Sequence, residues 1–264
     1  MINNLQYETF GLAFAKKAGK IIKQNFSLNM VKEWKADVTP VTDTDNNINS
    51  LLIKAIHKNF PGHSILAEEE SHLTDSDYVW VCDPVDGTIP FSHGIPICTF
   101  SLALVHKGKS IFGVVYDPFS DRLFYASLGK GAFLNGKRIA VSGNNNFVGA
   151  FADFEMFKRA KYDVFELVEN IIHEDSNLMK ACSVIYPSML LAAGEVAFVI
   201  FPHDTAHDAA AVKIIVEEAG GKVTDLFGKD QRYDRPIKGF IASNGLLHSQ
   251  LVVKSKKCTK LNRQ

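Results

Sequence analysis

Residues 80–88 combine two carboxylates with a turn that is suited to binding anions. They read Trp-Val-Cys-Asp-Pro-Val-Asp-Gly-Thr, so an apolar run leads directly into Asp83 and Asp86. The proline between the two aspartates restricts the backbone, and Gly87 allows a backbone N–H group to approach an anion closely. This segment therefore predicts a place where a divalent cation and a phosphate are held together.

Further carboxylates occur at the ends of predicted elements, where a rigid scaffold can aim them. Asp45 lies at the start of a predicted helix, Glu68 and Glu69 follow a predicted strand, and Asp208 opens the predicted helix 209–219. Carboxylates that converge on one point repel each other unless a cation neutralises them. Oxygen ligands without a required cysteine or histidine favour Mg²⁺, with Mn²⁺ also possible, over zinc.

Such a site is suited to phosphoryl transfer to water. Two Mg²⁺ ions can acidify a bound water, clamp the phosphoryl oxygens and steady the leaving alkoxide, and this reaction depends mainly on alignment and charge stabilisation. The backbone N–H groups of Gly87 and Thr88, at the start of a short predicted helix, can receive the phosphate. The Thr88 hydroxyl and Glu68 can orient and deprotonate the attacking water.

Each piece of this pattern also has a purely structural explanation. Asp-Pro and Asp-Gly are common turn dipeptides, residues 68–70 suit a solvated surface, and Asp208 alone suits a helix N-cap. His203 and His207 are four residues apart, a spacing that can bind zinc from one helix face. Pro202 predicts instead that His203 precedes the helix, so His207 is expected beside the metal pocket or against the substrate. The ordered occurrence of all the pieces favours the functional interpretation.

Apolar periodicity predicts the elements that position these residues. Helices are expected at residues 7–26, 43–60, 164–172, 187–194, 209–219 and 246–253. Strands are expected at residues 64–67, 78–82, 98–106, 110–116, 122–126, 147–153, 196–201, 222–224 and 239–242, with a tight hairpin at 132–139. Short turns between strands predict antiparallel hairpins. The fold class is therefore α+β, with layers of helices and mixed or antiparallel sheets.

The polar run at residues 143–146 is the best candidate for a domain boundary. It divides the chain into residues 1–143, with most of the proposed metal ligands, and residues 144–264, with Asp208 and the recognition residues. We expect the two parts to pack so closely that they can count as one domain.

The overall composition limits the partners and the location. The chain of 264 residues has 29 basic and 29 acidic residues, so we expect a small phosphorylated metabolite as partner, and neither nucleic acid nor a membrane. The four cysteines are scattered, without CxxC spacing, which is typical of reduced thiols. With neither a signal peptide nor a membrane-spanning apolar run, we expect a cytoplasmic protein.

Taken together, the motifs resemble the inositol monophosphatase family of lithium-sensitive, Mg²⁺-dependent phosphomonoesterases. The matching segments are residues 41–45, 67–69, 80–88, 207–211 and 217–221, with softer matches at 91–96, 113–118 and 131–136. The resemblance spans nearly the whole chain, and the combined motifs are highly specific. It implies an αβαβα layered fold and, commonly, a homodimer.

The resemblance also implies a set of metal ligands. Glu68, Asp83 and the backbone carbonyl of Val85 match ligands of the activating metal. Asp83, Asp86 and Asp208 match ligands of the second metal.

Further roles concern the water and the phosphate. Asp45 matches a position that helps to orient the water or a third, weaker metal, which makes two or three Mg²⁺ ions in all. Glu68 and Thr88 match the pair that activates the water, and Asp86, Gly87 and Thr88 match the loop that faces the phosphate.

The sequence departs from the family most where the substrate is recognised. The inositol-recognising glutamate of the family aligns, counting back from Asp208, with Phe201, which cannot accept hydrogen bonds from ring hydroxyls. The neighbouring recognition segment, residues 182–184, is also altered and contains Ser183. Losing an acceptor weakens discrimination for a hydroxylated ring, so we expect a preferred substrate other than myo-inositol phosphate.

The predicted function is hydrolysis of a small phosphomonoester by a metal-activated water. Candidate substrates are an inositol or sugar phosphate and histidinol phosphate. One alternative is a 3′(2′)-phosphoadenosine phosphate nucleotidase of the same superfamily. Another is a non-catalytic regulator that keeps the fold and binds a phosphorylated ligand, which would not need Glu68 and Thr88 together.

Overall fold

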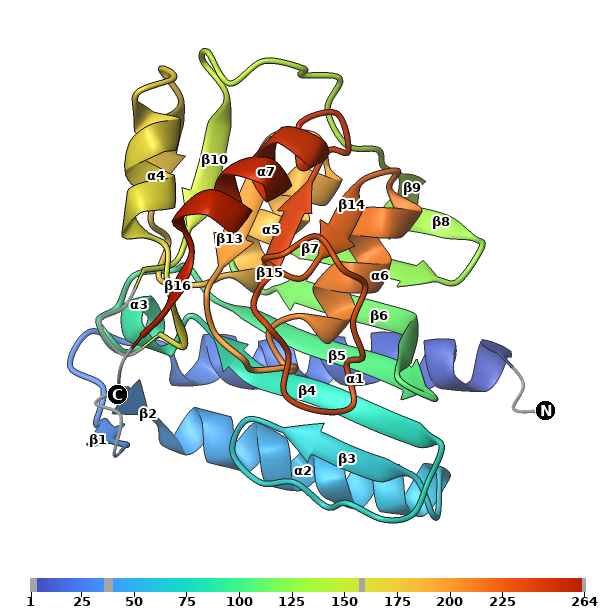
Figure 1. Cartoon of the computed structure of the whole chain (residues 1–264). Coiled ribbons are helices and arrows are strands. Elements are labelled where there is room, and N and C mark those ends of the chain that lie inside the picture. Colours follow the sequence, from blue (N-terminus) through green and yellow to red (C-terminus); the bar gives the residue numbers. More distant parts are fainter. Residues whose placement is uncertain (1–3, 36–39, 157–159, 263–264) are drawn as a thin grey trace.

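Two β-sheets alternate with three layers of helices in this protein (Figure 1). The computed structural model describes residues 4–35, 40–156 and 160–262. The order of layers is helix, sheet, helix, sheet, helix, which confirms the expected αβαβα arrangement and the α+β class. None of the helices in these ranges combines the length and the apolar character needed to cross a membrane.

The first layer contains α1 (Asn4–Asn25) and α2 (Asp43–Asn59), which lie along one face of the first sheet. Buried side chains recur at helical spacing on both, including Phe14 and Ile22 on α1 and Ile48 and Ile56 on α2. Between the two helices, β1 (Glu33–Trp34) and β2 (Pro40–Val41) form a small antiparallel ladder.

The first sheet follows the chain order without a crossover, from β3 to β9. Its strands are β3 (Ser64–Ala67), β4 (Tyr78–Asp86), β5 (Thr99–His106), β6 (Lys109–Asp117), β7 (Arg122–Ser127), β8 (Gly131–Leu134) and β9 (Lys137–Arg138). Only the β3–β4 pair among them is parallel, so the expected hairpins are confirmed. On β4, Trp80 and Cys82 face the first helical layer, while Val79 and Val81 face the middle of the molecule.

The prediction that this strand ends at Cys82 was wrong, since β4 continues to Asp86. Its pairing with β5 shifts register between Asp83 and Asp86. Pro84 lies within the shift, where its missing N–H group does not interrupt a regular ladder. The irregularity also changes the direction of the side chains at this end of the strand. The short helix α3 (Thr88–Ser92) follows β4.

The second sheet is mixed, and its strands come from the later part of the chain. Their order is β12 (Asn177–Met179), β10 (Phe151–Phe154), β13 (Phe198–Phe201), β15 (Phe240–Ser243) and β14 (Lys222–Thr224). β10 runs parallel to β12 and β13, whereas β15 is antiparallel to β13 and β14. The three-residue strand β12 has no buried side chain, so no apolar run announces it in the sequence.

Two helices, α5 (Ile185–Ala192) and α6 (Ala210–Glu218), fill the space between the sheets. The outer layer contains α4 (Phe165–Ile172) and α7 (His248–Cys258), and β11 (Tyr162–Asp163) pairs with β16 (Lys260–Leu261) nearby. The core between the sheets joins Val81 and Phe124 to Val199 and Ile215 in one cluster. The division after residue 143 stays a prediction, and residues from both sides of it share this core.

Helix α6 lies close to β6 because Gly113 has no side chain. A Cβ atom at Gly113 would meet Cγ2 of Ile214 at 2.5 Å and the Cα atom and carbonyl oxygen of Ala211 at 3.2 and 3.3 Å. The backbone atoms cannot move without the helix. The contact therefore sets the distance between α6 and the first sheet.

We predict that Gly113→Ala lowers the free energy of unfolding by about 1–3 kcal/mol, the usual range for overpacking a core. The matched control is Gly143→Ala, since a Cβ atom there would meet nothing within 4 Å. Urea unfolding followed by circular dichroism measures both. Equal losses in the two variants would contradict this account of the helix–sheet contact.

Candidate active site

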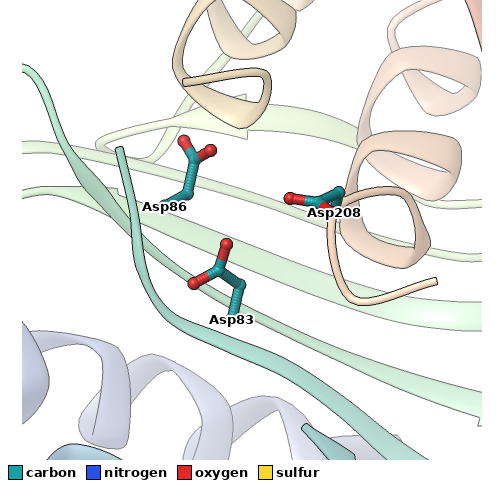
Figure 2. Close-up of side chains that lie close together, drawn as sticks. All are labelled: Asp83, Asp86 and Asp208. Atoms are coloured by element: carbon teal, nitrogen blue, oxygen red, sulfur yellow. The ribbon is translucent and has the colours of Figure 1, made fainter. Parts of the chain in front are cut away.

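Two buried aspartates and one partly exposed aspartate meet where the first sheet faces the start of α6. Asp83 and Asp86 come from the end of β4, and Asp208 lies just before α6 (Figure 2). Each of them offers a carboxylate oxygen, and these oxygens lie within 4.8 Å of one another. The structure therefore brings the Asp208 carboxylate to two others that lie more than a hundred residues earlier in the sequence.

Asp86 is held by the N-terminal end of α5. Its Oδ1 accepts a hydrogen bond from the Val184 N–H (3.0 Å), and its Oδ2 accepts one from the Tyr186 N–H (3.2 Å). The hydroxyls of Ser183 and Thr99 also donate to Oδ2. A carboxylate at a helix N-terminus satisfies free N–H groups and is favoured by the helix dipole. Asp86 thus belongs to the first sheet and caps a helix of the middle layer.

Asp83 and Asp208 have fewer donors around them. Oδ1 of Asp83 accepts a hydrogen bond from the Val85 N–H at 2.9 Å, inside the irregular end of β4. Oδ2 of Asp208 accepts one from the Thr205 hydroxyl, and Nε2 of His207 lies 3.5 Å away from it. These two carboxylates therefore retain oxygen lone pairs that can bind a further partner.

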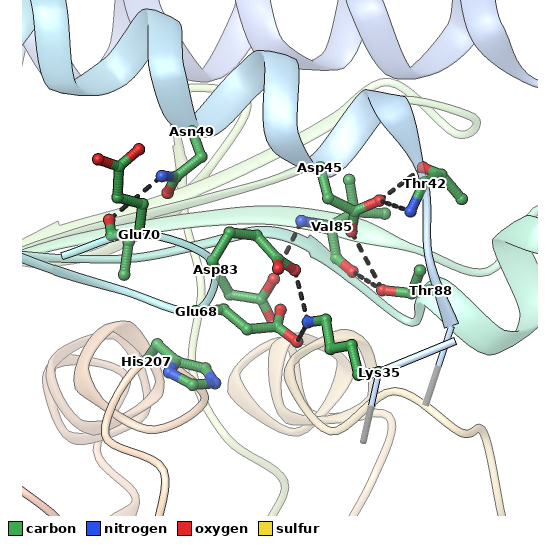
Figure 3. Close-up of polar contacts among 12 residues, drawn as sticks. Lys35, Thr42, Asp45, Asn49, Glu68, Glu70, Asp83, Val85, Thr88 and His207 are labelled. Atoms are coloured by element: carbon green, nitrogen blue, oxygen red, sulfur yellow. Dashed lines mark hydrogen bonds and ion pairs between the residues drawn. The ribbon is translucent and has the colours of Figure 1, made fainter. Parts of the chain in front are cut away.

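A second network surrounds Asp45 at the start of α2 (Figure 3). Oδ2 of Asp45 accepts hydrogen bonds from the N–H and the hydroxyl of Thr42, at 2.9 and 2.5 Å, which completes a capping box. The Thr88 hydroxyl lies 3.2 Å from Oδ1 of Asp45 and 2.9 Å from the carbonyl oxygen of Val85. The start of α2 is thereby tied to the turn that follows β4.

Lys35 bridges the two glutamates at the end of β3. Its Nζ lies 2.8 Å from Oε1 of Glu68 and 2.6 Å from Oε1 of Glu69. All three side chains are partly exposed, so the bridge lies at the edge of the site. Lys35 was not predicted as a site residue, because a single lysine 33 residues before Glu68 carries no spacing signal.

Burial dominates the electrostatics of this cluster. It raises the pKa of Asp45 and of Asp86 to about 6, although hydrogen bonds from Thr42 and Ser183 oppose the shift. Burial, together with the charges of neighbouring carboxylates, raises the pKa of Asp83 well above its usual value, and the pKa of Asp208 is raised as well. Burial lowers the pKa of Lys35, but the carboxylates of Glu68 and Glu69 outweigh this effect and leave it above its usual value.

The donor set fits a hard divalent cation. It consists of carboxylate and carbonyl oxygens, which Mg²⁺ and Mn²⁺ prefer. Burial makes the ionised forms of these converging acids costly, and a cation bound among them would lower that cost. Among the described residues, His203 and His207 join no group of three or more close ligands, so nothing favours a zinc site there.

The residues expected to face the substrate lie in two different environments. Gly87 has a φ of +88°, and a Cβ atom there would meet the carbonyl oxygen of Ile97 at 2.7 Å, so only glycine fits this turn. Ser183 is buried and donates its hydroxyl to Asp86. Phe201 is 4% exposed and packs against Phe240, with ring centroids 5.2 Å apart. Its ring therefore belongs to the core between the sheets.

Comparison with known proteins decides the family. A model of the inositol monophosphatase family matches residues 3–260. The chain belongs to this family. Its members are phosphoric monoester hydrolases, so the expected enzyme class is confirmed, as is the family resemblance.

Individual relatives are similar to this chain along nearly its whole length. A fructose-1,6-bisphosphatase/inositol-1-monophosphatase of Thermotoga maritima is 33% identical over 250 residues, covering 92% of this chain and 93% of the relative. A histidinol-phosphatase of Chlorobaculum parvum is 30% identical over 246 residues, covering 91% and 93%. The solved structure of the Thermotoga maritima IMPase has a TM-score of 0.86 at 31% identity and covers 96% of this chain and 97% of that one.

Two buried acidic residues near Asp86 were not predicted from the sequence. Asp153 and Glu155 are 0% and 2% exposed, and both lie near the segment that holds Asp86. In the sequence they interrupt an apolar strand pattern at alternate positions. This alternation could have indicated a role for them, since acidic residues are rarely buried on one face of a strand unless they have partners.

The raised pKa values predict that Mg²⁺ stabilises the protein more as pH rises. Asp45 and Asp86 have folded-state pKa values of about 6 against an ordinary 3.8, so their protonation stabilises the fold at low pH. This stabilisation is lost as pH rises through about 6, and a cation then replaces the protons. We expect the Mg²⁺-induced rise in Tm to be small at pH 5 and severalfold larger at pH 7.5.

Differential scanning fluorimetry at matched ionic strength measures this effect, with Na⁺ replacing Mg²⁺ as the control. A Mg²⁺ effect that shrinks as pH rises would contradict the proposed link between the cation and the carboxylates.

Proposed function

We propose that this protein is a Mg²⁺-dependent phosphatase that hydrolyses a small phosphomonoester by means of a metal-activated water. The observation that carries the proposal is the group formed by Asp83, Asp86 and Asp208, whose carboxylate oxygens lie within 4.8 Å of one another. The raised pKa values of these acids support a cation among them.

Two overlapping ligand sets would hold the cations. Glu68, Asp83 and the Val85 carbonyl form the first set, and Asp83, Asp86 and Asp208 form the second. Asp45, whose Oδ1 lies 3.2 Å from the Thr88 hydroxyl, would hold a third, weaker ion. Mg²⁺, or Mn²⁺ in its place, supplies a more acidic bound water and charge stabilisation on the phosphoryl group.

The protein's own residues orient the attacking water. The Thr88 hydroxyl carries one proton, which it donates to the Val85 carbonyl or to Asp45, and this leaves a lone pair that accepts a hydrogen bond from water. Lys35 contacts Oε1 of Glu68, and the other carboxylate oxygen of Glu68 takes up the proton of the water.

The phosphate is received by the turn after β4. The left-handed backbone at Gly87 lets the N–H groups of Gly87 and Thr88 face an anion. Asp86 and Asp208, with Ser183 beside Asp86, line the side of the substrate on which the alcohol leaves. Positioning of this kind is the main requirement of phosphoryl transfer.

The substrate is a phosphorylated metabolite whose alcohol is not fixed by an acceptor at Phe201. The Phe201 ring is buried in the core between the sheets and offers no acceptor to the hydroxyls of myo-inositol, which removes one source of discrimination. The substrates named for the relatives suggest a sugar phosphate, an inositol phosphate or histidinol phosphate. A 3′(2′)-phosphoadenosine phosphate nucleotidase and a non-catalytic regulator that binds a phosphorylated ligand are the competing proposals.

We further propose that the protein acts as a homodimer in the cytoplasm, without nucleic acid or membrane as a partner. The zero formal net charge supports the absence of polyanionic partners. The four cysteines are free, which agrees with a reducing compartment.

We predict that Asp83→Asn reduces Mg²⁺-dependent phosphate release by at least about a hundredfold on every active substrate, since the change removes a charge shared by both ligand sets. A panel of inositol 1-phosphate, fructose 1,6-bisphosphate, histidinol phosphate and 3′-phosphoadenosine 5′-phosphate measures this loss and identifies the substrate. Asp225→Asn, at a buried aspartate outside the site, is the matched control. Equally slow phosphate release by the wild type and Asp83→Asn would contradict the proposed phosphatase activity and favour the non-catalytic regulator.

We also predict inhibition by millimolar Li⁺, because Asp86 and Asp208 are both present in the second ligand set. A small monovalent cation can occupy these oxygens but carries half the charge, so it stabilises the leaving alkoxide poorly. Phosphate release is measured against LiCl, with NaCl at the same concentration as control. Identical rates of phosphate release in the two salts would show that Asp86 and Asp208 do not form the proposed second metal site.

A further inference from the structure

The segment of residues 181–184 connects β12 to α5 and determines where the Asp86 carboxylate points. It contributes the Ser183 hydroxyl and the Val184 N–H, both of which donate to Asp86. A displacement of this segment would therefore be transmitted directly to a proposed metal ligand.

Two buried carboxyls lie behind this segment. Oδ1 of Asp153 accepts a hydrogen bond from the Ala181 N–H at 3.0 Å, and Oε1 of Glu155 accepts one from the Ser183 N–H at 3.2 Å. Asp153 lies in β10, and the Glu155 N–H bonds to the carbonyl of Ile200, which continues the pairing of β10 with β13. The two side chains therefore point to the same face of the strand.

The backbone that these carboxyls hold has an unfavourable conformation. Cys182, between the two bonded N–H groups, has a φ of +54°, in the left-handed region that favours glycine. A side chain at such a position is strained, and the strain persists only where surrounding contacts enforce it. The hydrogen bonds on either side of Cys182 are contacts of that kind.

We propose that Asp153 and Glu155 are positioning residues for phosphate hydrolysis. They hold residues 181–184 in the conformation that aims Asp86 at the cation, and they do so across a turn where this chain has cysteine instead of glycine. The inference rests on the proposed function, because it assumes that Asp86 binds the metal. The hydrogen bonds of both carboxyls go to this segment, so both act on Asp86 through the backbone that they hold.

The burial of the two acids is consistent with this role. It raises the pKa of Asp153 to about 7 and that of Glu155 to about 8, so Glu155 is largely uncharged at neutral pH. An uncharged carboxyl still accepts a hydrogen bond through its carbonyl oxygen. A glutamine at 155 preserves that acceptor, whereas a leucine removes it and leaves the Ser183 N–H unpaired.

The first experiment compares Glu155→Leu with Glu155→Gln by Mn²⁺ titration, followed by electron paramagnetic resonance without substrate. We expect Glu155→Leu to weaken Mn²⁺ binding by about tenfold, the lower end of the range for residues that orient metal ligands. Glu155→Gln should remain within about threefold of the wild type. Asp153→Leu and Asp153→Asn repeat the comparison on the other carboxyl, so the result does not depend on one variant folding.

The matched control is Asp225→Leu. Asp225 is also a buried aspartate that accepts two backbone N–H groups, from Phe227 and Lys229 at 2.9 and 2.7 Å. It follows β14, which β13 and β15 separate from β10. This variant should lose stability without losing Mn²⁺ affinity. An equal loss of affinity in Asp225→Leu and Glu155→Leu, or no loss in either, would overturn the positioning role.

A second experiment tests the connection to Cys182 by a double-mutant cycle. Glycine adopts the left-handed conformation without strain, so the Cys182→Gly background should need less support. We expect Glu155→Leu to weaken Mn²⁺ binding by less than about threefold in that background. The same tenfold factor in both backgrounds would overturn the assignment of the carboxyl pair to this turn.

The outcomes distinguish failure of the proposed function from failure of the positioning role. If the wild type binds no Mn²⁺ and releases no phosphate with Mg²⁺, the proposed function fails. If the wild type binds the ion and hydrolyses the substrate while Glu155→Leu binds the ion equally well, only the positioning role fails.

Discussion

Repulsion among buried carboxylates is the constraint on which the rest of this structure depends. Asp83 and Asp86 are buried, the carboxylate of the partly exposed Asp208 lies close to them, and burial makes the ionised forms costly. The fold offsets part of this cost with donors, most of them around Asp86 at the start of α5. Where donors are few, at Asp83 and Asp208, the remaining negative charge favours a cation. The arrangement of strands and helices can be understood as the means of holding these charges at a fixed separation.

Local patterns in the sequence predicted much of the fold because each pattern has a direct physical cause. A continuous apolar run predicted β4, since both of its faces are buried against cores. Helical spacing of apolar residues predicted α1 and α2. The extension of β4 past Cys82 was not predicted, because Pro84 normally ends a regular strand and only the pairing with β5 shows the irregularity. Strand β12 was also missed, since three partly exposed residues carry no burial signal.

The site residues that belong to short sequence motifs could be predicted from the sequence. The acids of residues 83–88 and Asp208 were grouped from the sequence, and the structure brings their carboxylates together, although their roles as ligands remain proposals. Lys35, Asp153 and Glu155 were missed because their partners lie far away along the chain. The contact between Glu155 and residue 183 depends on how β10 and β12 pair, and that pairing has no local signature.

The capping of α5 by Asp86 has a consequence for the order in which the molecule assembles during synthesis. A nascent chain that has emerged only as far as β9 carries Asp83 and Asp86 but lacks both Asp208 and the helix end that receives Asp86. Such an intermediate holds two close acids without the donors that Ser183, Val184 and Tyr186 later provide to Asp86. Docking of the later segments therefore removes an electrostatic penalty from the earlier ones, which couples completion of the site to completion of the fold.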